Sequence, residues 1–370
     1  MRPAVPGAIA ECYSAGVRVV MITGDQPHTA SSIGRQIGLR AADEVLTGAD
    51  LEGLSDDELS RRVRSVNIFA RVAPEQKLRL VRALQALGEV VAMTGDGVND
   101  APALKAADIG IAMGGRGTDV AREASGLVLL DDDFATIARA IRLGRRIFDN
   151  LKSAMAYILA IHVPIAGMTI VPVLFGLPLV LMPVHIAFLH LIIEPACSVV
   201  FEVEPEDPDV MKRPPRDPRA PLYGKRLVGL ALLQGTVVLA ILLAIFLVAL
   251  QRGKGEAEAR SLAFATLVVA NLALIFVNRS WYRSFSQSLR APNQALWWVI
   301  GGGLVFLFVV LEVPVLRDLF RFATLHADDI AVTIGAGLLS VGWFEIVKSI
   351  GRRRHLAHVQ ITGTSHASGR

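Results

Sequence analysis

Two acidic turns contain the residues of this sequence that are best suited to chemistry. In TGDGVND, at positions 94–100, Asp96 and Asp100 stand beside Gly95 and Gly97, which let the backbone approach a ligand closely. Carboxylate oxygens are ligands that Mg²⁺ prefers, and the ion can bridge protein and phosphate. The pattern indicates magnesium-dependent phosphoryl chemistry. The alternative is an Asp/Asn-rich turn that only caps the next helix, which has a similar sequence.

A lysine near a helix start offers the positive charge that phosphoryl chemistry needs. In RVAPEQK, at positions 71–77, Pro74 suits the first turn of a helix, so Lys77 lies near a helix end that accepts phosphate. Alone, this segment fits a solvated helix lysine better. A second TGD turn, made of Thr23, Gly24 and Asp25, favours the functional interpretation because two such turns accompany the lysine.

Short strands and helices that alternate along residues 17–130 must position these turns. Strands are expected at residues 17–23, 45–47, 68–70, 90–94, 109–113 and 127–130. Helices are expected at residues 27–37, 55–64, 74–87 and 100–106. This alternation predicts a parallel sheet covered on both faces, with the two TGD turns at the carboxyl ends of strands, where ligands bind.

Composition divides the chain into a soluble part and a membrane part. Hydrophobic residues make up 52% of the 370 residues, and the mean hydropathy of +0.47 is too high for a purely soluble protein. The net charge is +4, but no basic patch interleaved with aromatic residues is present, which argues against a nucleic-acid partner. Cys12 and Cys197 are far apart, so neither a disulfide framework nor a cysteine metal site is indicated.

The membrane part is expected to contain six helices that cross a lipid bilayer. The apolar runs lie at residues 154–175, 179–203, 227–250, 261–278, 296–315 and 330–347. Lysine and arginine cluster in alternate connections and at residues 348–354, which places the soluble domain and the C-terminus in the cytoplasm. We therefore expect an integral membrane protein.

Ionisable residues in the first two expected spans are candidates for an ion site. His190 and Glu194 are one helical turn apart, Pro195 follows, and His162 lies near Pro164 in the preceding span. Ionisable groups inside a membrane are costly and usually functional, and proline frees a backbone carbonyl. The alternatives are a carboxylate at the interface for Glu194 and buried, hydrogen-bonded imidazoles for the two histidines.

These segments together resemble the phosphorylation domain of P-type ATPases, the ion pumps that phosphorylate themselves on an aspartate. Similarity to the type II pumps, which include the calcium pumps, also runs through GRRIFDNLK at 144–152 and EPEDPDVMKRPPRDP at 204–218. The resemblance implies an incomplete α/β domain of the haloacid-dehalogenase-like, Rossmannoid kind with a stalk helix at residues 1–150. It further implies an all-α domain of six transmembrane helices at residues 151–350 and a cytoplasmic tail at residues 351–370.

The resemblance also assigns roles to individual residues. It implies that Asp96 binds Mg²⁺, that Lys77 and Thr23 hold the phosphoryl group, and that Asp25 helps to place the nucleotide. Supporting roles fall to Asn99 and Asp100 beside the magnesium site and to Gly24 in the first turn. ATP is implied by the family alone, because the phosphate-binding pattern GxxxxGK[ST] does not occur.

Two motifs of the family are absent from these residues. Neither the nucleophile motif DKTGT nor the dephosphorylation motif TGES occurs, so we expect the C-terminal part of a cation pump that is inactive without its missing N-terminal half. The alternative is a non-catalytic, truncated or split membrane subunit that associates with another pump chain. A membrane-anchored phosphatase needs a DxD motif before the first TGD turn, and that requirement is not met. The expected location is a bacterial inner membrane.

The transported cation is left open by the sequence. Where calcium pumps carry Asn-Val-Gly-Glu, this chain has His162-Val-Pro-Ile, and its second span has His190 and Glu194 instead of Asn-x-x-Thr-Asp. Val268 stands where a calcium pump tends to place a glutamate. Because calcium prefers six to eight oxygen ligands, one carboxylate with two imidazoles suits a transition metal or a proton relay better.

Overall fold

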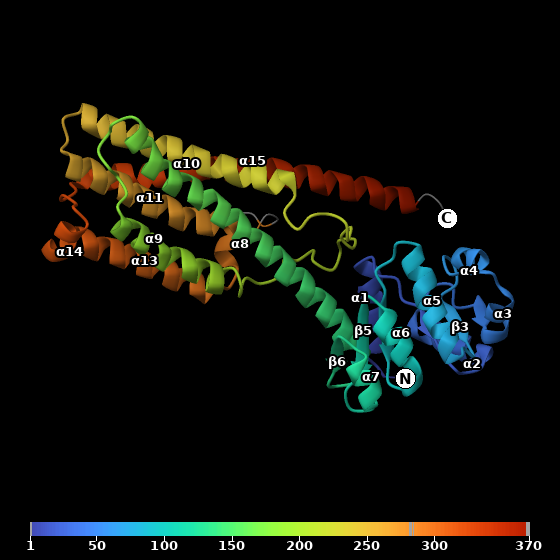
Figure 1. Cartoon of the computed structure of the whole chain (residues 1–370). Coiled ribbons are helices and arrows are strands. Elements are labelled where there is room, and N and C mark those ends of the chain that lie inside the picture. The colour runs from blue at the N-terminus through green and yellow to red at the C-terminus, as the bar shows by residue number, and fades with distance from the viewer. Residues whose placement is uncertain (1, 281–282, 284, 368–370) are drawn as a thin grey trace. The chain divides into compact units, whose positions relative to one another are not determined.

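The computed structural model describes residues 2–280, 283 and 285–367, and the chain forms two compact units. The first unit comprises Met1–Arg145 and Pro208–Ala220, and the second comprises Arg146–Asp207 and Pro221–Arg370. Figure 1 shows strands and short helices in the first unit and long helices in the second.

In the described part of the first unit, six short parallel strands form the centre. One sheet has the order β1-β3-β2, built from β1 (Met21–Ile22), β3 (Ile68–Ala70) and β2 (Val45–Thr47). The other has the order β4-β5-β6, built from β4 (Ala92–Gly95), β5 (Ile109–Met113) and β6 (Leu127–Leu129). The predicted parallel pairing is confirmed, but the expected single sheet is wrong, because within the described residues β1 and β4 each lie at the end of a separate sheet.

The helices of the first unit follow the predicted alternation with additions. They are α1 (Val5–Ser14), α2 (Pro27–Ile37), α3 (Gly48–Gly53), α4 (Asp56–Arg62), α5 (Pro74–Ala86), α6 (Ala101–Ala106) and α7 (Asp119–Glu123). α1, α3 and α7 were not predicted. The start of α3 has a local signal, because the side chain of Thr47 accepts the N–H of Asp50 and the Asp50 carboxylate accepts the N–H of Thr47.

The second unit is helical. Its helices are α8 (Phe134–Leu174), α9 (Pro183–Pro195), α10 (Lys225–Gln251), α11 (Glu256–Asn278), α12 (Phe285–Arg290), α13 (Gln294–Glu312), α14 (Pro314–Leu319) and α15 (Ala327–Ala367). Among the described residues, six of the helices are long and apolar enough to cross a membrane, in agreement with the six predicted runs. α8 begins twenty residues before the first predicted span, and its first part belongs to the first unit. α15 continues as a helix through most of the predicted tail.

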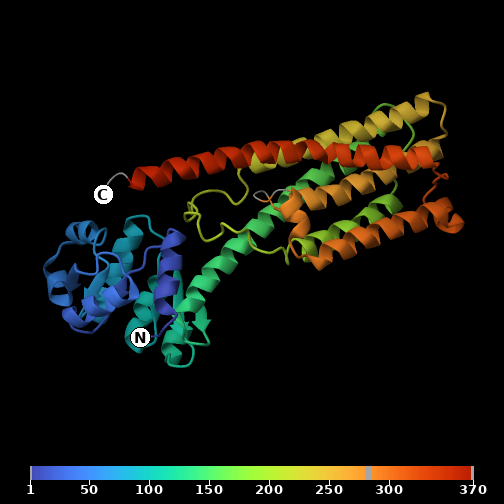
Figure 2. The ribbon, with the colours of Figure 1, turned by 180° about the vertical axis from the view of Figure 1, so that it is seen from behind.

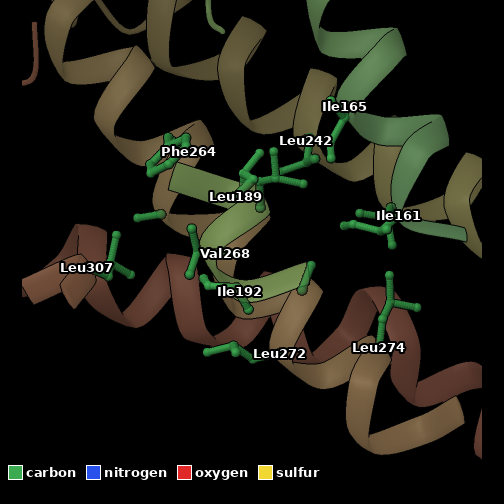
Figure 3. Close-up of a cluster of buried hydrophobic side chains, with 14 of the residues drawn as sticks. Ile161, Ile165, Leu189, Ile192, Leu242, Phe264, Val268, Leu272, Leu274 and Leu307 are labelled. Atoms are coloured by element: carbon green, nitrogen blue, oxygen red, sulfur yellow. The ribbon is translucent and has the colours of Figure 1, made fainter. Parts of the chain in front are cut away.

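α11 lies at the centre of the helical unit. In its most apolar window 83% of the residues are buried, against 22% to 39% in the other five candidate spans. Figure 3 shows Phe264, Val268, Leu272 and Leu274 of this helix among side chains of its neighbours. Seen from behind in Figure 2, the long helices of this unit again run side by side. The apolar core therefore surrounds α11, while α8 and α9 keep an exposed face.

Candidate functional site

The turn after β4 is closed by its own aspartate. Asp100 is 7% exposed, and its Oδ2 accepts the backbone N–H of Asp96 at 3.3 Å and of Gly97 at 3.2 Å. Gly95 is needed at the end of the strand, because a Cβ there would lie 2.5 Å from the Cβ of Asp100. The turn therefore has one conformation in which the Asp100 carboxylate points inward.

Lys77 reaches this turn from the first helical turn of α5. Its Nζ lies 2.6 Å from Oδ1 of Asp100, and the two side chains are 19% and 10% exposed. The ion pair joins the connection after β3 to the turn after β4. In this position the ammonium group is held beside the acidic turn, where it can attract a phosphate.

Asp96 and Asn99 remain open to solvent at the same turn. The backbone is fixed there, because Thr118 donates its N–H to the Asp96 carbonyl at 2.9 Å. Mg²⁺ typically takes one or two protein carboxylates and completes its shell with water and phosphate oxygens. An exposed Asp96 carboxylate on a fixed turn fits that requirement.

The strand below the turn is held by a residue that sequence reasoning missed. Asp108 accepts the N–H of Val91 at 2.8 Å and a hydrogen bond from Gln85 at 3.2 Å. These donors lower the pKa of the Asp108 carboxyl, the Val91 N–H having the larger effect. No local sequence pattern predicts the hydrogen bonds of Asp108 to Val91 and Gln85, because the three residues come from different elements.

The first TGD turn is joined to the connection between β3 and α5. The N–H of Thr23 donates to the Phe69 carbonyl at 2.9 Å, and Thr23 Oγ1 accepts the N–H of Asp25 at 3.1 Å. Val72 and Arg71 donate their N–H groups to the carbonyls of Thr23 and Asp25, each at 3.2 Å. In the described part of the chain, no hydrogen bond or ion pair links Thr23 or Asp25 to Asp96 or Lys77. The first turn is thus fixed beside the segment that leads to Lys77, with Gly24 and Asp25 exposed.

The connection that carries Lys77 has two further features that the sequence did not reveal. Arg71 has a φ of +51°, a left-handed conformation that is uncommon for a residue with a side chain. Gln76 accepts the N–H of Ala73 at 2.9 Å and donates to the Gly48 carbonyl at 2.8 Å. The glutamine, three residues after the N-cap residue Ala73 in RVAPEQK, was the available signal.

The two membrane histidines lie close together on the exposed face of α8 and α9. The ring centroids of His162 and His190 are 6.3 Å apart, and both residues are exposed. Nδ1 of His162 lies 2.7 Å from the Ile158 carbonyl, which can only accept a hydrogen bond. Nδ1 therefore carries the proton, and a neutral His162 presents the lone pair of Nε2 to a ligand.

Glu194 lies at a change of helix type. Glu194 is exposed. It precedes Pro195, the last residue of α9, and one turn of π-helix follows at Ala196–Val200. The hydroxyl of Ser198 donates to the Glu194 carbonyl at 2.7 Å. Among the described residues, the Glu194 carboxylate has no hydrogen bond or ion pair. π-turns often occur at functional sites in helices, which fits a ligand-binding role here.

The backbone carbonyl that Pro164 frees, which we expected as a possible cation ligand, packs against α10 instead. Pro164 has no N–H, so the carbonyl of Ala160 loses its helical partner. Gly235 of α10 packs against that carbonyl so closely that a Cβ would lie 2.3 Å from its oxygen. Val268 is fully buried in the apolar core (Figure 3). The proline therefore supports the packing of α8 on α10. At position 268, α11 offers an apolar side chain and no cation ligand.

Two family comparisons match separate parts of the chain. Residues 1–108 match the family described as haloacid dehalogenase-like hydrolase. Residues 178–350 match the family described as cation transporting ATPase, C-terminus. The first match contains both TGD turns and Lys77, and the second contains His190 and Glu194.

Individual relatives extend over most of the chain. A calcium-transporting ATPase of Bacillus subtilis is 40% identical over 338 residues, which are 90% of this chain and 38% of the relative. A probable cation-transporting ATPase F of Mycobacterium bovis is 41% identical over 87% of this chain and 36% of the relative. A calcium-transporting ATPase 1 of Schizosaccharomyces pombe is 36% identical over 95% of this chain and 40% of the relative. The chain thus spans about two fifths of the length of these relatives.

Proposed function

The chain corresponds to the C-terminal portion of a cation-transporting P-type ATPase, and we propose that it supplies the phosphate-binding turn and the ion-binding helices of an ATP-driven pump. The chain spans about two fifths of the length of its relatives. We therefore propose ATP-driven cation transport for the whole pump and not for this chain alone. ATP and Mg²⁺ are the cofactors that the family implies.

The ion pair between Lys77 and Asp100 is the observation that carries the proposal. It holds an ammonium group beside an open Asp96 carboxylate, so the turn offers a positive charge for phosphate and a ligand for a metal ion. Mg²⁺, when bound, would neutralise charge between Asp96 and the phosphate. Lys77 would orient the phosphoryl group, and Thr23 and Asp25 would stand at the end of the neighbouring sheet.

The unpaired edges of β1 and β4 support the proposal that another part of the pump supplies the nucleophilic aspartate. Within the described residues, β1 and β4 have unpaired edges, and Ile22 and Met93 of these strands share one apolar cluster. An unpaired strand edge is a template for another strand. We propose that a further strand of the pump pairs here and ends in the aspartate that becomes phosphorylated.

The exposed Glu194 supports a second contact with protein outside these residues. A carboxylate that faces lipid near the middle of a membrane costs about 3 kcal/mol on insertion scales. Since His162 and His190 are exposed as well, additional helices would cover this face and complete the ligands of the transported cation. The positive charges flanking the spans support our proposal that the soluble unit is cytoplasmic.

Ion-stimulated ATP hydrolysis by the full-length pump tests this assignment. The variant Glu194→Gln should fold and lose stimulation, because it removes the negative charge of the ion site. Glu312→Gln, which changes an exposed carboxylate at the end of α13, is the matched control and should keep stimulation. Unchanged stimulation of Glu194→Gln by every cation tested would remove Glu194 from the site.

The open edges and the exposed membrane face equally fit a split subunit that associates with another pump chain. Labelling with ³²P separates the two arrangements. The purified chain should incorporate no acid-stable phosphate from ATP when it is alone, and should support labelling when it is coexpressed with the N-terminal part of a relative. Labelling of the chain alone would contradict the proposal that the nucleophile lies elsewhere.

A further inference from the structure

Three potential metal ligands meet where α11 and α15 begin. Glu258 lies in the first turn of α11, His326 immediately precedes α15, and Asp329 lies in its first turn. One carboxylate oxygen of each acid and one imidazole nitrogen all lie within 4.8 Å of one another. The group contains none of the residues assigned to the phosphate or to the transported cation, so it needs an explanation of its own.

The group lies at a well-connected end of the helical unit, the end that carries α14 in Figure 1. Nε of Arg260 donates to the Leu179 carbonyl at 2.9 Å. Ser261 donates its hydroxyl to the Ala323 carbonyl at 3.1 Å and accepts the Ala323 N–H at 2.9 Å. These bonds fix the start of α11 against the chain that leads into α15. Under the proposed topology this end faces away from the cytoplasm.

Asp329 is the fixed ligand of the group, and His326 is the adjustable one. Asp329 is 6% exposed, and its Oδ2 accepts the backbone N–H of His326 at 3.2 Å. The His326 side chain is 79% exposed, with Nδ1 3.8 Å from the same oxygen. Two ligands of one zinc ion lie at most about 4 Å apart, because each bond is about 2.0–2.2 Å long. Closing the site therefore needs only a small movement of an exposed ring.

The ammonium group of Lys254 occupies the space between the two carboxylates. It contacts Glu258 and lies 2.9 and 3.0 Å from the two oxygens of Asp329. Its side chain is 26% exposed, so it has a route into water. One ammonium group offsets only one of the two negative charges. A divalent ion would neutralise both carboxylates and release the lysine.

A buried hydroxyl without a partner lies one helical turn after Asp329. Thr333 is 4% exposed, and its Oγ1 has no hydrogen-bond partner among the described residues. Hydroxyls on other long helices donate to the carbonyl four residues earlier, as Thr169, Thr236 and Thr266 do at 2.8 Å. Thr333 shares the helix face of Asp329, and helical side chains lean toward the N-terminus. A buried hydroxyl is costly unless a ligand or water supplies its partner, so Thr333 points to a bound group at this site.

We propose that Glu258, His326 and Asp329 bind a divalent transition-metal ion of the zinc class, which displaces the ammonium group of Lys254. One imidazole nitrogen with two carboxylate oxygens suits Zn²⁺, whereas Ca²⁺ takes six to eight oxygen ligands. A water molecule would complete the four ligands, and Thr333 would hydrogen-bond to the ligands of the ion. The ion would link the start of α11 to the start of α15. This site goes beyond the proposed pump function, because its ligands take no part in phosphorylation or in the proposed transport site.

Calorimetric titration of the purified chain with Zn²⁺ in detergent tests the site. Every protein carries His162→Gln and Glu194→Gln to disable the proposed transport site, and excess Mg²⁺ occupies sites made of oxygen alone. The chain should bind one Zn²⁺. His326→Asn, which changes an exposed side chain, should lower the affinity about tenfold or more, the range seen even for outer partners of metal ligands. Asp328→Asn removes a charge from an exposed neighbour and is the matched control, which should keep the affinity.

Two further variants separate a metal site from a structural ion pair. Lys254→Met should raise the affinity for Zn²⁺, because it removes the competing cation, and Lys254→Gln repeats the comparison with a polar side chain. Thr333→Val keeps the shape of the side chain and should lower the affinity without lowering the unfolding midpoint of the metal-free chain, because the lost hydroxyl had no partner. Co²⁺ in place of Zn²⁺ should give a visible absorption band that His326→Asn changes.

The site is overturned if the chain binds no Zn²⁺, or if His326→Asn binds as tightly as the unmodified chain. An equal loss in Asp328→Asn would show general attraction to acidic groups, and weaker binding by both Lys254 variants would show that the lysine belongs to the fold alone. Either result contradicts the proposal. Failure of the pump to show ion-stimulated ATP hydrolysis would instead contradict the proposed function and leave the zinc site standing.

Discussion

Lys77 and Asp100, twenty-three residues apart in sequence, form an ion pair of 2.6 Å that links two separate βα connections. Both side chains are largely buried, so neither charge is stabilised by water alone. The carboxylate also receives the N–H groups of Asp96 and Gly97. One residue therefore closes the turn and positions the lysine.

Removal of the lysine charge should slow phosphorylation most. In the full-length pump, Lys77→Met should reduce the rate of phosphoenzyme formation by about 10² or more, the range seen when a preorganised charge or donor is removed. Asp100→Asn should have a smaller effect, because an amide oxygen can still accept the turn's N–H groups. Rapid-quench ³²P labelling measures both rates. Lys105→Met, an exposed lysine on α6, should label normally, and a similar loss there would point to misfolding.

The two glycines of the second turn should differ in their tolerance of alanine. Gly95→Ala places a Cβ 2.5 Å from Asp100 and should cost about 1–3 kcal/mol through overpacking. Gly97→Ala should be close to neutral, because its nearest contact would be 3.6 Å and its φ of −108° is open to alanine. Hydrogen exchange of peptides covering residues 90–113 distinguishes them. Equal exchange in the two variants would contradict the tight contact at Gly95.

A second glycine pair tests the packing of the membrane helices. Gly235→Ala should destabilise the bundle by about 1–3 kcal/mol, because the new methyl group would press on the Ala160 carbonyl. Gly229→Ala on the same helix has no atom within 4 Å of the new Cβ and should leave stability unchanged or slightly raised. Thermal unfolding in detergent, followed by tryptophan fluorescence, measures the difference. A lower midpoint for Gly229→Ala would contradict the assignment of the close approach to Gly235.

Lys254 should stabilise the connection between α10 and α11 over a wide pH range. Its ammonium group contacts Glu258 and lies 2.9 and 3.0 Å from the two oxygens of Asp329 at the start of α15. The hydrogen bond to Glu258, followed by that to Asp329, raises the pKa of Lys254 above its ordinary value of 10.5. Because the folded state binds the proton more tightly, this stabilisation is complete below the unfolded pKa and is lost as pH rises through the folded pKa.

Lys254→Met should therefore lower the unfolding midpoint at neutral pH by an amount that stays constant up to about pH 9, since both states keep the proton there. Above about pH 10.5 the difference from the unmodified chain should shrink. Arg252→Met changes an exposed cation of the same connection and serves as the control. A difference that grows with rising pH would exclude this ion pair as its source.

Local sequence pattern was sufficient for most elements of both units. The strands at residues 45–47, 68–70 and 109–113 and the helix Pro27–Ile37 have the bounds that were predicted, because apolar runs, proline and glycine act over a few residues. The helix at Gly48–Gly53 was missed, since its six residues are too short for a periodic pattern. The six spans were found because twenty apolar residues leave few alternatives.

The candidate residues were also recognisable from their types and spacing, which are chemical properties of short segments. Their partners were not. The pairing of Lys77 with Asp100, the approach of His162 to His190 and the burial of Glu204 among Arg279, Arg283 and Asn293 depend on contacts between elements far apart in sequence. Such contacts are selected by packing and by the need to pair buried charge, and both act only once the chain has folded. Residue identity thus specified which chemistry was available, and tertiary packing decided which groups meet to perform it.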